Sequence, residues 1–445
     1  MELRSTRMKI QLIHPPADKN YHCPEARWLR SAPIGLELIA SALSSDVEVE
    51  IIDGSNLSID EILDKIDGDY VGVSDWYSKH DSALKILERA KEKGAITIIG
   101  GSNATHLSDR ILRNHSFVDY AIVGDGEEAF SRLIDEDAVD EISNLVYRQG
   151  NRIVRNPTMN VRLNRLFNLE HMINPDYDRN NPFPLSSIRG CIKAEKDERC
   201  SFCSIDHRLK IMNANHVWEQ IGLLKSQYEF DYFFETGDSF IVGKYPELLL
   251  DRRPEHLKNV KFRIYASPDQ INEQVIETLK KLNVQEIFLG VESVDETILR
   301  QAGKKYSRAQ IDLALELIHQ AGIQVQVPFI YGLPGETIET MEKSYQYAKS
   351  ILETQPHTKL LVSAPIPLVG SRLFENLRED SRVKREYAGD LDKDDAFDYE
   401  QLIRLQTKYS SSVKYEEMMQ YVAKTRALAR DGNVAGLGFL TINNS

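Results

Sequence analysis

Two series of short apolar runs, each run followed by a stretch of helical periodicity, constrain the fold of this 445-residue chain more than any other feature. Alternation of strands and helices is typical of parallel sheets covered by helices. The first series therefore predicts an α/β domain over residues 8–140, a Rossmann-like doubly wound parallel sheet whose ligands lie beyond the carboxyl ends of the strands. Its strands are expected at Lys9–Ile13, Val47–Asp53, Tyr70–Ser74, Ile96–Gly101 and Asp119–Gly124.

The second series predicts a partial (β/α)6 barrel of the TIM type over residues 184–375, with its chemistry at the carboxyl mouth of the strands. Residues 141–183 are expected to form a hairpin around Gly150-Asn151 and then a linker punctuated by Asn and Pro. Residues 376–445 are expected to form a helical C-terminal region. The barrel strands are expected at Leu185–Arg189, Asp231–Glu235, Lys261–Ala266, Gln285–Val291, Ile323–Ile330 and Lys359–Pro365.

Three of the four cysteines fall close together at Cys191, Cys200 and Cys203, directly after the first expected barrel strand. A few grouped thiols in a large chain indicate metal ligands rather than a disulfide framework. Three thiolates would hold three irons of a [4Fe–4S] cluster and leave the fourth iron open to an outside ligand. Two other interpretations remain: a structural zinc site completed by His207, and ordinary buried thiols.

The charge and hydropathy of the chain limit the kinds of partner that it is expected to bind. The net charge of −13 argues against a nucleic-acid backbone as the main partner, because phosphate binding favours a basic surface. The chain has no apolar run of about eighteen residues that would span a membrane, and the segment Met1–Arg7 lacks the apolar core of a signal peptide. We therefore expect a cytoplasmic protein without a membrane or nucleic-acid partner, in a compartment where thiols stay reduced.

These motifs, taken in order, give a chain that resembles the radical S-adenosylmethionine (SAM) superfamily, and within it the subset with an N-terminal cobalamin-binding domain. The resemblance covers roughly residues 8–375. In the first domain it rests on Ile13-His14-Pro15-Pro16, Ile99-Gly100-Gly101 and Gly124-Asp125-Gly126-Glu127. In the second it rests on Arg189-Gly190-Cys191, Cys200-Ser201-Phe202-Cys203, Gly290-Val291-Glu292-Ser293 and Gly332-Leu333-Pro334-Gly335-Glu336-Thr337.

The resemblance implies that Cys191, Cys200 and Cys203 hold a [4Fe–4S] cluster whose open iron chelates SAM. It also implies reductive cleavage of SAM, usually to a 5′-deoxyadenosyl radical, and an electron donor such as flavodoxin or ferredoxin. The residues implied to bind SAM are Glu235, Thr236 and Gly237 near the methionine amino group, Glu292 and Ser293 near the ribose or sulfonium, and Ile330 and Gly332 along the adenine.

Other positions are expected to meet the cofactors or the substrate. Arg263, on the third barrel strand, is expected to meet a carboxylate of cofactor or substrate if it points inward. Cobalamin is expected at strand ends of the first sheet, where glycine lets a ligand approach the backbone closely. The alternative for the glycine pair is a tight strand-to-helix turn. The cobalamin-binding positions are Ser74, Gly100, Gly101 and Gly124, with Trp28, Trp76 and Tyr77 as candidate stacking residues.

Two departures from the family pattern stand out. Eight residues separate Cys191 from Cys200, whereas the family's usual motif has three there. Loop-closure cost grows slowly with length, so a cluster can still form. The Asp-x-His-x-x-Gly sequence that supplies a histidine to cobalt in some cobalamin proteins is missing, as it is in many members of the subset that the chain resembles. His14, His22 and Cys23 are the residues near the first strand that could approach the cofactor instead.

The function that the resemblance implies is cobalamin-dependent methylation of a small molecule. A radical rearrangement, a cyclisation, or 3-amino-3-carboxypropyl transfer after cleavage of a different carbon–sulfur bond is the alternative within the same superfamily. The lengthened cysteine loop would fit that last reaction. The alternative from another class is a non-catalytic zinc-binding interaction protein.

Overall fold

The computed structural model describes residues 7–18, 31–173, 175–196, 198–205, 208–355 and 357–428. The chain divides into two compact units. Among the described residues, unit 1 takes those up to Tyr177 and also Asp392–Ala396, and unit 2 takes those of Asp178–Leu391 and those from Phe397 onward. The candidate residues His22, Cys23, Trp28 and His207 lie outside the described residues.

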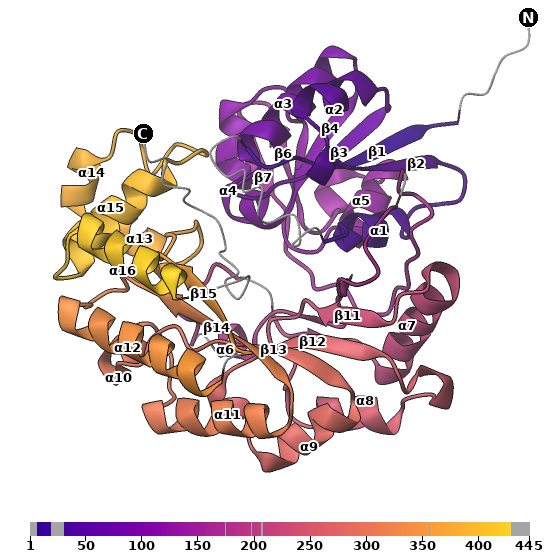
Figure 1. Cartoon of the computed structure of the whole chain (residues 1–445). Coiled ribbons are helices and arrows are strands. Elements are labelled where there is room, and N and C mark those ends of the chain that lie inside the picture. Colours follow the sequence, from indigo (N-terminus) through magenta and orange to yellow (C-terminus); the bar gives the residue numbers. More distant parts are fainter. Residues whose placement is uncertain are drawn as a thin grey trace, which may run out of the picture. The chain divides into compact units, whose positions relative to one another are not determined.

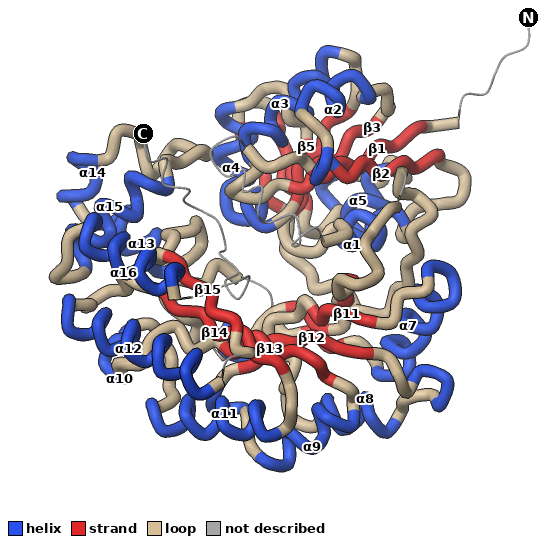
Figure 2. The backbone as a smooth tube through the Cα atoms, in the orientation of Figure 1, coloured by secondary structure: helices blue, strands red, loops and turns tan. Residues whose placement is uncertain are grey.

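Unit 1 is a seven-stranded sheet in the order β2-β1-β3-β4-β5-β6-β7, flanked by helices (Figures 1 and 2). Strands β1 to β5 are parallel, as predicted, and each ends within two residues of its predicted limit. The predicted hairpin forms β6 and β7, which extend this sheet in the antiparallel sense instead of standing apart from it. The strands are β1 Lys9–His14, β2 Glu48–Asp53, β3 Tyr70–Ser74, β4 Ile96–Gly100, β5 Tyr120–Ile122, β6 Leu145–Gln149 and β7 Arg152–Arg155.

The helices of unit 1 bury one apolar face each against the sheet. In α3 the buried positions recur at helical spacing, with Ala83, Ile86, Leu87 and Ala90 fully buried. Helix α2 begins at a capping box in which Ser58 accepts from the Glu61 amide while the Glu61 carboxylate accepts from Ser58. The helices are α1 Ile34–Ala40, α2 Ile59–Lys65, α3 His80–Glu92, α4 Ser102–Asn114 and α5 Glu127–Ile134.

Unit 2 contains a six-stranded parallel sheet in the order β15-β14-β13-β12-β11-β8, which confirms the partial barrel. Figure 1 shows α9, α11 and α12 along one side of β12 to β15. The strands are β8 Phe183–Leu185, β11 Tyr232–Glu235, β12 Lys261–Ala266, β13 Val284–Leu289, β14 Gln324–Ile330 and β15 Lys359–Ser363. Its helices are α7 Ala214–Tyr228, α8 Tyr245–Asp251, α9 Glu273–Lys281, α10 Glu296–Gln301, α11 Arg308–Gln320 and α12 Ile338–Thr354.

The first barrel strand differs from its prediction. Only β8 belongs to the barrel, while β9 Ile188–Arg189 pairs antiparallel with β10 Lys210–Ile211. The cause is Ser187, whose backbone N–H and hydroxyl both donate to the buried carboxylate of Glu235. This interaction ends the pairing with β11 and redirects the chain toward the cysteine loop.

Four further helices follow the barrel: α13 Arg372–Glu379, α14 Ser381–Glu386, α15 Tyr399–Ser410 and α16 Tyr415–Ala427. Helix α16 packs against α12 and β15. There the Tyr331 and Thr425 hydroxyls lie 2.8 Å apart, and both residues are buried. The helical C-terminal region therefore adds to the core of unit 2.

The segment Asp392–Ala396, between α14 and α15, belongs to unit 1 through a buried polar cluster. His80 Nδ1 lies 3.0 Å from the Asp75 carboxylate, and its Nε2 lies 3.5 Å from Asp395. Asp395 also accepts hydrogen bonds from Asn114 at 2.8 Å and His115 at 2.7 Å. Burial lowers the pKa of His80, but the Asp75 and Asp395 carboxylates outweigh burial and raise this pKa to about 10. His80 is therefore a buried cation held between two carboxylates.

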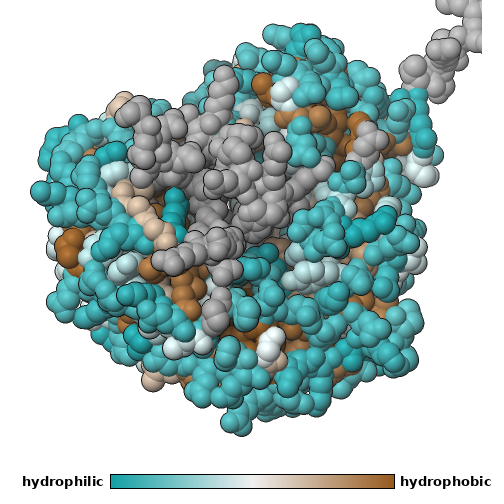
Figure 3. Space-filling view, in the orientation of Figure 1, coloured by the Kyte–Doolittle hydropathy of each residue, from teal (hydrophilic) through white to brown (hydrophobic). Residues whose placement is uncertain are grey.

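The surface carries scattered apolar side chains. The face drawn in Figure 3 is mostly hydrophilic, with hydrophobic residues in separate small groups. The large exposed apolar side chains include Trp76, Leu248, Leu313 and Ile338, which lie on different elements. Among the described residues, no helix has both the length and the apolar content needed to cross a membrane.

Candidate functional site

Cys191, Cys200 and Cys203 belong to one loop of unit 2, and the structure brings their thiols near one another. Burial raises the pKa of the Cys203 thiol to about 12, and the neighbouring Cys200 and Cys191 sulfurs add to this rise. The Ser239 hydroxyl donates to Cys191 Sγ at 3.4 Å, and the Ile205 amide lies 3.5 Å from Cys203 Sγ. Thiolates crowded in this way need a cationic centre to stabilise them, so the donor set suits a metal cluster.

The single-ion alternative needs a fourth ligand, and His207, the residue proposed for it, lies outside the described residues. In the described part of the chain, no three His, Cys, Asp or Glu side chains form a group that could hold a metal ion. A [4Fe–4S] cluster, by contrast, takes each thiolate on a different iron.

The lengthened part of the cysteine loop is partly helical. After Gly190, whose φ is +83°, Cys191 leads into the short helix α6 Ile192–Glu195. Further along the loop, Glu198 is exposed and pairs with Lys305 at 2.7 Å. The extra residues are thus accommodated in a helical turn and at the surface while the three cysteines stay together.

The segment from Cys200 to Cys203 is held by the chain after α10 and by the start of α13. The Ser201 amide donates to the Ala302 carbonyl at 3.0 Å, and the Leu373 amide donates to the Ser201 carbonyl at 2.9 Å. Gly303 has φ +81°, and a Cβ built there would lie 2.9 Å from the Arg199 carbonyl oxygen. A side chain at position 303 would therefore push against the loop that carries Cys200.

The predicted residues Glu235, Thr236 and Gly237 lie at the carboxyl end of β11, where they fix the cysteine loop. The fully buried Glu235 carboxylate accepts from Ser187 and from the Gly237 amide at 2.9 Å. Burial raises the pKa of Glu235 to about 7 even though these hydrogen bonds lower it. A Cβ at Gly237 would lie 2.6 Å from Ile188 Cβ, so β9 passes directly over this glycine. Thr236 donates to the Leu185 carbonyl through both its amide and its hydroxyl.

Glu292 lies at the carboxyl mouth and pairs with Lys304, a residue that sequence reasoning missed. Lys304 Nζ lies 3.2 Å from Glu292 Oε1, and both residues are buried. Burial lowers the pKa of Lys304, but Tyr306, Glu292 and the nearby Cys200 outweigh it and raise this pKa well above its ordinary value. The only hint in the sequence was a lysine in a Gly-Lys-Lys-Tyr run shortly after a predicted strand-end glutamate. The Lys304 ammonium therefore lies close enough to Cys200 to interact with it electrostatically.

Glu292 adopts an unusual backbone conformation. Its φ is +63°, a region that costs a non-glycine residue energy, and it forms an isolated bridge with Phe329. The Glu292 amide donates to the Pro328 carbonyl, and the Ile330 amide donates to the Glu292 carbonyl, both at 2.9 Å. These two hydrogen bonds fix Glu292 and the half-buried Ile330 side by side at the mouth.

Ser293 and Gly332 are placed differently from the other predicted SAM residues. Ser293 is fully buried, with its hydroxyl 3.4 Å from that of Ser344 on α12. A Cβ at Gly332 would lie 2.2 Å from Met418 Sδ, so α16 covers this glycine. The Gly332 and Leu333 amides donate to Glu336, whose burial raises its pKa to about 8. These contacts order the loop after β14.

Arg263 lies inside the barrel and below its mouth, three residues before the end of β12. Its Nη2 donates to Gln326 Oε1 at 3.0 Å, and its Nε lies 3.6 Å from Glu286. The guanidinium lies 4.7 Å from the centre of the Phe234 ring. Arg263 therefore points into the barrel, which is one of the two orientations that the sequence left open. Its contacts are with the barrel wall and not with the cysteine loop.

In unit 1, the predicted cobalamin residues lie at the carboxyl edge of the sheet. Among the described residues, a side chain built at Gly124 would meet no atom within 4 Å, and one built at Gly100 would meet the Ile122 carbonyl oxygen at 3.8 Å. These two positions form a cradle that a bulky ligand can approach. Gly101 differs, because its φ is +103° and a Cβ would lie 2.6 Å from the Asp75 carbonyl oxygen, so it closes a tight turn. The Ser74 hydroxyl lies at the same edge, at the end of β3.

His14 is engaged within the protein. Its Nδ1 lies 3.0 Å from the Ser74 hydroxyl and its Nε2 lies 2.6 Å from Lys79 Nζ. Burial and the Lys79 ammonium lower the pKa of His14 to about 3. Neutral His14 therefore accepts from Lys79. Trp76 is half exposed in the loop after β3, where it stays a candidate for stacking.

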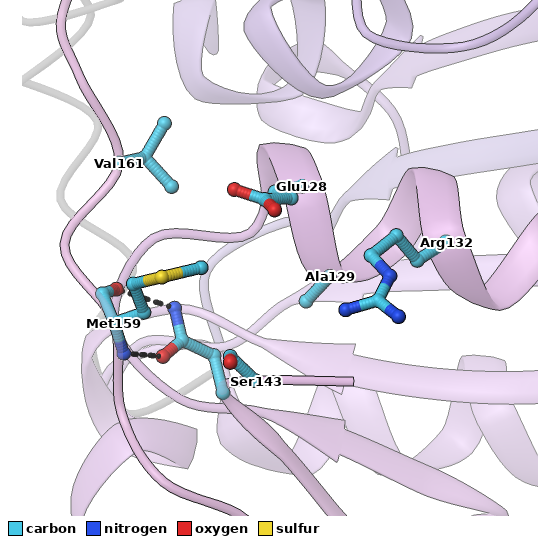
Figure 4. Close-up of a pocket in the computed structure, with 7 residues that line it drawn as sticks. Glu128, Ala129, Arg132, Ser143, Met159 and Val161 are labelled. Atoms are coloured by element: carbon cyan, nitrogen blue, oxygen red, sulfur yellow. Dashed lines mark hydrogen bonds between the residues drawn. The ribbon is translucent and has the colours of Figure 1, made fainter. Parts of the chain in front are cut away.

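A small pocket in unit 1 lies away from these residues. Figure 4 shows its lining, which comes from α5, from the residues just before β6 and from the chain after β7. Asn144 in this lining donates to the Met159 carbonyl at 3.0 Å and accepts from the Met159 amide at 2.6 Å. Its empty volume, including the open solvent at its mouth, is about 220 Å³. None of the predicted site residues lines it.

Comparisons with known proteins agree with this geometry. The radical SAM superfamily matches residues 186–348, and the B12-binding domain matches residues 29–134. A chain that carries both is a radical SAM protein whose B12-binding domain precedes the partial barrel in the sequence. This chain belongs to that branch of the radical SAM superfamily and is an enzyme of it, with the [4Fe–4S] cluster, SAM and cobalamin as the cofactors of its two domains.

Individual relatives are distant in sequence. An uncharacterised methyltransferase of Pyrococcus horikoshii is 24% identical over 394 residues, which cover 83% of each chain. The anaerobic magnesium-protoporphyrin IX monomethyl ester cyclase of Rubrivivax gelatinosus is 23% identical over 93% of this chain and 79% of its own. The radical SAM methyltransferase TsrM of Kitasatospora setae, solved with cobalamin and a [4Fe–4S] cluster, aligns with a TM-score of 0.71 and 15% identity over 98% of this chain and 92% of its own. The structural likeness shows that the two share a fold.

Proposed function

We propose that the enzyme is a cobalamin-dependent methyltransferase that cleaves SAM at a [4Fe–4S] cluster on Cys191, Cys200 and Cys203 and methylates a small molecule. The observation that carries the proposal is the gathering of three thiols, a buried lysine and a buried glutamate at the carboxyl mouth of a partial barrel. Relatives that are named methyltransferases support methyl transfer as the reaction. When bound, the cluster supplies an electron and the cobalamin carries the methyl group.

Lys304 is the residue best suited to bind the carboxylate of SAM. It is a buried cation close to Cys200, with Glu292 as its described ion-pair partner. An ammonium with three donors can serve Glu292 and a second carboxylate together. Glu292 in turn accepts hydrogen bonds, which suits the ribose hydroxyls of SAM. Glu235 has its carboxylate occupied by Ser187 and Gly237, so it orients the loop and the Thr236 segment rather than taking a ligand directly.

The cradle at Gly100 and Gly124 in unit 1 is the position proposed for cobalamin, with Ser74 as a hydrogen-bonding neighbour. His14 lies beside it but is held by Ser74 and Lys79. We therefore propose that His14 leaves cobalt without an imidazole ligand. An electron donor such as flavodoxin or ferredoxin completes the proposed system.

The test is mass spectrometry of the products that anaerobically reconstituted protein makes from SAM, a strong reductant and cobalamin. S-adenosylhomocysteine with 5′-deoxyadenosine is the expected result, because methyl transfer leaves the first and radical formation the second. 5′-Methylthioadenosine as the main product would replace methylation with 3-amino-3-carboxypropyl transfer. Zinc without iron or sulfide in the purified protein would overturn the proposal, and a Cys200→Ala variant should lose iron and all SAM cleavage.

A further inference from the structure

The inner wall of the unit 2 barrel differs from the interior of an ordinary closed barrel. Along β12, Phe262 faces α7, where it packs edge-on against Trp218, so its neighbours Arg263 and Tyr265 face the interior. The same alternation places Phe234 on β11 and Phe288 on β13 inside, and the contacts of Tyr265 with both rings confirm this. These interior rings are half-buried, whereas the outward-facing set is at most 3% exposed. That outward set is Phe233, Phe262, Ile264 and Ile287.

A closed TIM barrel fills its interior with layers of branched aliphatic side chains. Here the strand register instead aligns Tyr265 with Phe288 and Phe288 with Gln326. The Tyr265 ring lies 5.2 Å from that of Phe234 at 56° and 5.0 Å from that of Phe288 at 67°. Such tilted pairs are a preferred arrangement of aromatic rings, and the Arg263 guanidinium lies 4.7 Å from the centre of the Phe234 ring, so the rings adjoin a charged group.

Below the rings the wall is charged. Glu286 lies 3.1 Å from Lys359 Nζ and 3.6 Å from Arg263 Nε, while Gln326 bridges Arg263 and Glu286 by hydrogen bonds of 3.0 and 2.6 Å. Arg263 and Glu286 are both buried, and Lys359 is one-third exposed. Two cations share one carboxylate, so these three side chains together carry one net positive charge. Within the part of the chain that the structure describes, Arg263 Nε also has no hydrogen-bond acceptor.

We propose that this inner wall, from Phe234 to Lys359, binds the substrate, and that the substrate is a planar unsaturated small molecule bearing one carboxylate. The inference rests on the proposed function and deepens it by naming a substrate class. The tilted rings of Phe234, Tyr265 and Phe288 take the planar part, and Arg263 with Lys359 takes the carboxylate. A guanidinium fork matches a carboxylate geometrically, and a single excess charge matches a carboxylate better than a phosphate monoester, which carries about −1.5 to −2.

The strand geometry also sets a length for this substrate. Arg263 precedes the end of β12 by three residues, and a strand rises by about 3.3 Å per residue. The charged cluster therefore lies roughly 10 Å below the mouth, where Glu292 and Lys304 lie. A molecule whose carboxylate and reacting atom are separated by roughly that distance fills the wall from the charged cluster to the mouth.

The test is ligand-observed saturation-transfer NMR on the full-length, anaerobically reconstituted protein with SAM. Three probes separate the two recognition elements: 3-(2-naphthyl)propionate, its primary amide, and 3-cyclohexylpropionate. We expect the naphthyl acid to bind, and both the amide and the cyclohexyl acid to bind about tenfold more weakly or worse, because each lacks one element. Equal binding of acid and amide, equal binding of the two acids, or no binding of any probe would overturn the proposal.

Variants locate the binding on the wall. Arg263→Gln and Lys359→Gln should each weaken binding of the naphthyl acid by about tenfold and leave the amide unchanged. Lys349→Gln is the matched control, since Lys349 lies exposed on α12. Lys359 is one-third exposed, so we expect Lys359→Gln to fold. This variant therefore tests the proposal even if Arg263→Gln fails to fold. Unchanged binding of the acid by Lys359→Gln would overturn the assignment. SAM cleavage by the wild-type protein, measured on the same preparation, reports on the proposed function separately.

Discussion

Replacing Asp395 by Asn tests the buried polar cluster that joins Asp392–Ala396 to unit 1. Asp395 accepts hydrogen bonds from Asn114 and His115 and pairs with the His80 cation. An amide keeps one acceptor oxygen but loses the charge, so at least one charge-assisted hydrogen bond is lost. Such a bond contributes about 1.5–3 kcal/mol, and we expect Asp395→Asn to destabilise unit 1 by about 2–3 kcal/mol. For a unit of this size that is a fall of roughly 4–12 °C in Tm.

The pH dependence of stability gives a second, sharper readout. The folded-state pKa of His80 is about 10, above its usual value of 6.5, so the stability it contributes is complete below pH 6.5 and is lost as the pH rises toward 10. The slope in that window is at most about 1.4 kcal/mol per pH unit. The Asp395 carboxylate helps to raise this pKa, so Asp395→Asn should flatten the slope.

The measurement is denaturant unfolding at several pH values between 6 and 9.5, followed by a probe in unit 1. Asp140→Asn is the control, since Asp140 is an exposed carboxylate of the same unit. The reasoning is refuted if Asp395→Asn unfolds within about 0.5 kcal/mol of the wild type at pH 6, the usual range for surface substitutions, or if its slope between pH 7 and 9 is unchanged.

Three other predictions concern unit 2. Lys304→Met should weaken SAM binding by about tenfold or more, because it removes a charged donor and takes away the ion-pair partner of Glu292. Lys305→Met, at an exposed lysine, should leave SAM binding unchanged. Isothermal titration of the reconstituted protein with SAM measures both. Gly303→Ala should lower the iron and sulfide content, since its Cβ would meet the Arg199 carbonyl; Gly322→Ala, also at positive φ but with open space around it, should keep its cluster. The Glu336 pKa is raised to about 8, so the free energy of unfolding of the wild type should fall as the pH rises from about 4.5 to 8. Denaturant unfolding curves of Glu336→Gln should show no such fall. A pH profile of the variant equal to that of the wild type would contradict the raised pKa of Glu336.

Much of the fold follows from local sequence patterns. Strand β3 has its predicted limits because its apolar run is bounded by Asp69 and Asp75, and β12 has its predicted limits because its first residues alternate between polar and apolar side chains. The first barrel strand was predicted wrongly because nothing local shows that Ser187 bonds to Glu235, a residue on another strand. The pairing of Asp395 with His115, 280 residues away, was equally invisible to any local pattern.

The candidate site likewise contains some residues that local sequence patterns predict and others that they do not. The cysteine spacing was sufficient to predict the three thiols, because their grouping is itself local. Lys304 was missed because its role depends on the turn after α10, which returns the chain to Glu292 at the mouth. The orientation of Arg263 could not be decided from the sequence either, since alternation within a strand does not show which face is inside until Trp218 packs against Phe262.

Within the described residues, the strand order β15-β14-β13-β12-β11-β8 begins and ends with strands that have no further partner in that sheet. Because this sheet does not close into a ring, the fixed circumference of a closed eight-stranded barrel does not set the width of the wall. A search for the substrate should therefore select compounds by their planar acidic part and should set no upper limit on molecular mass.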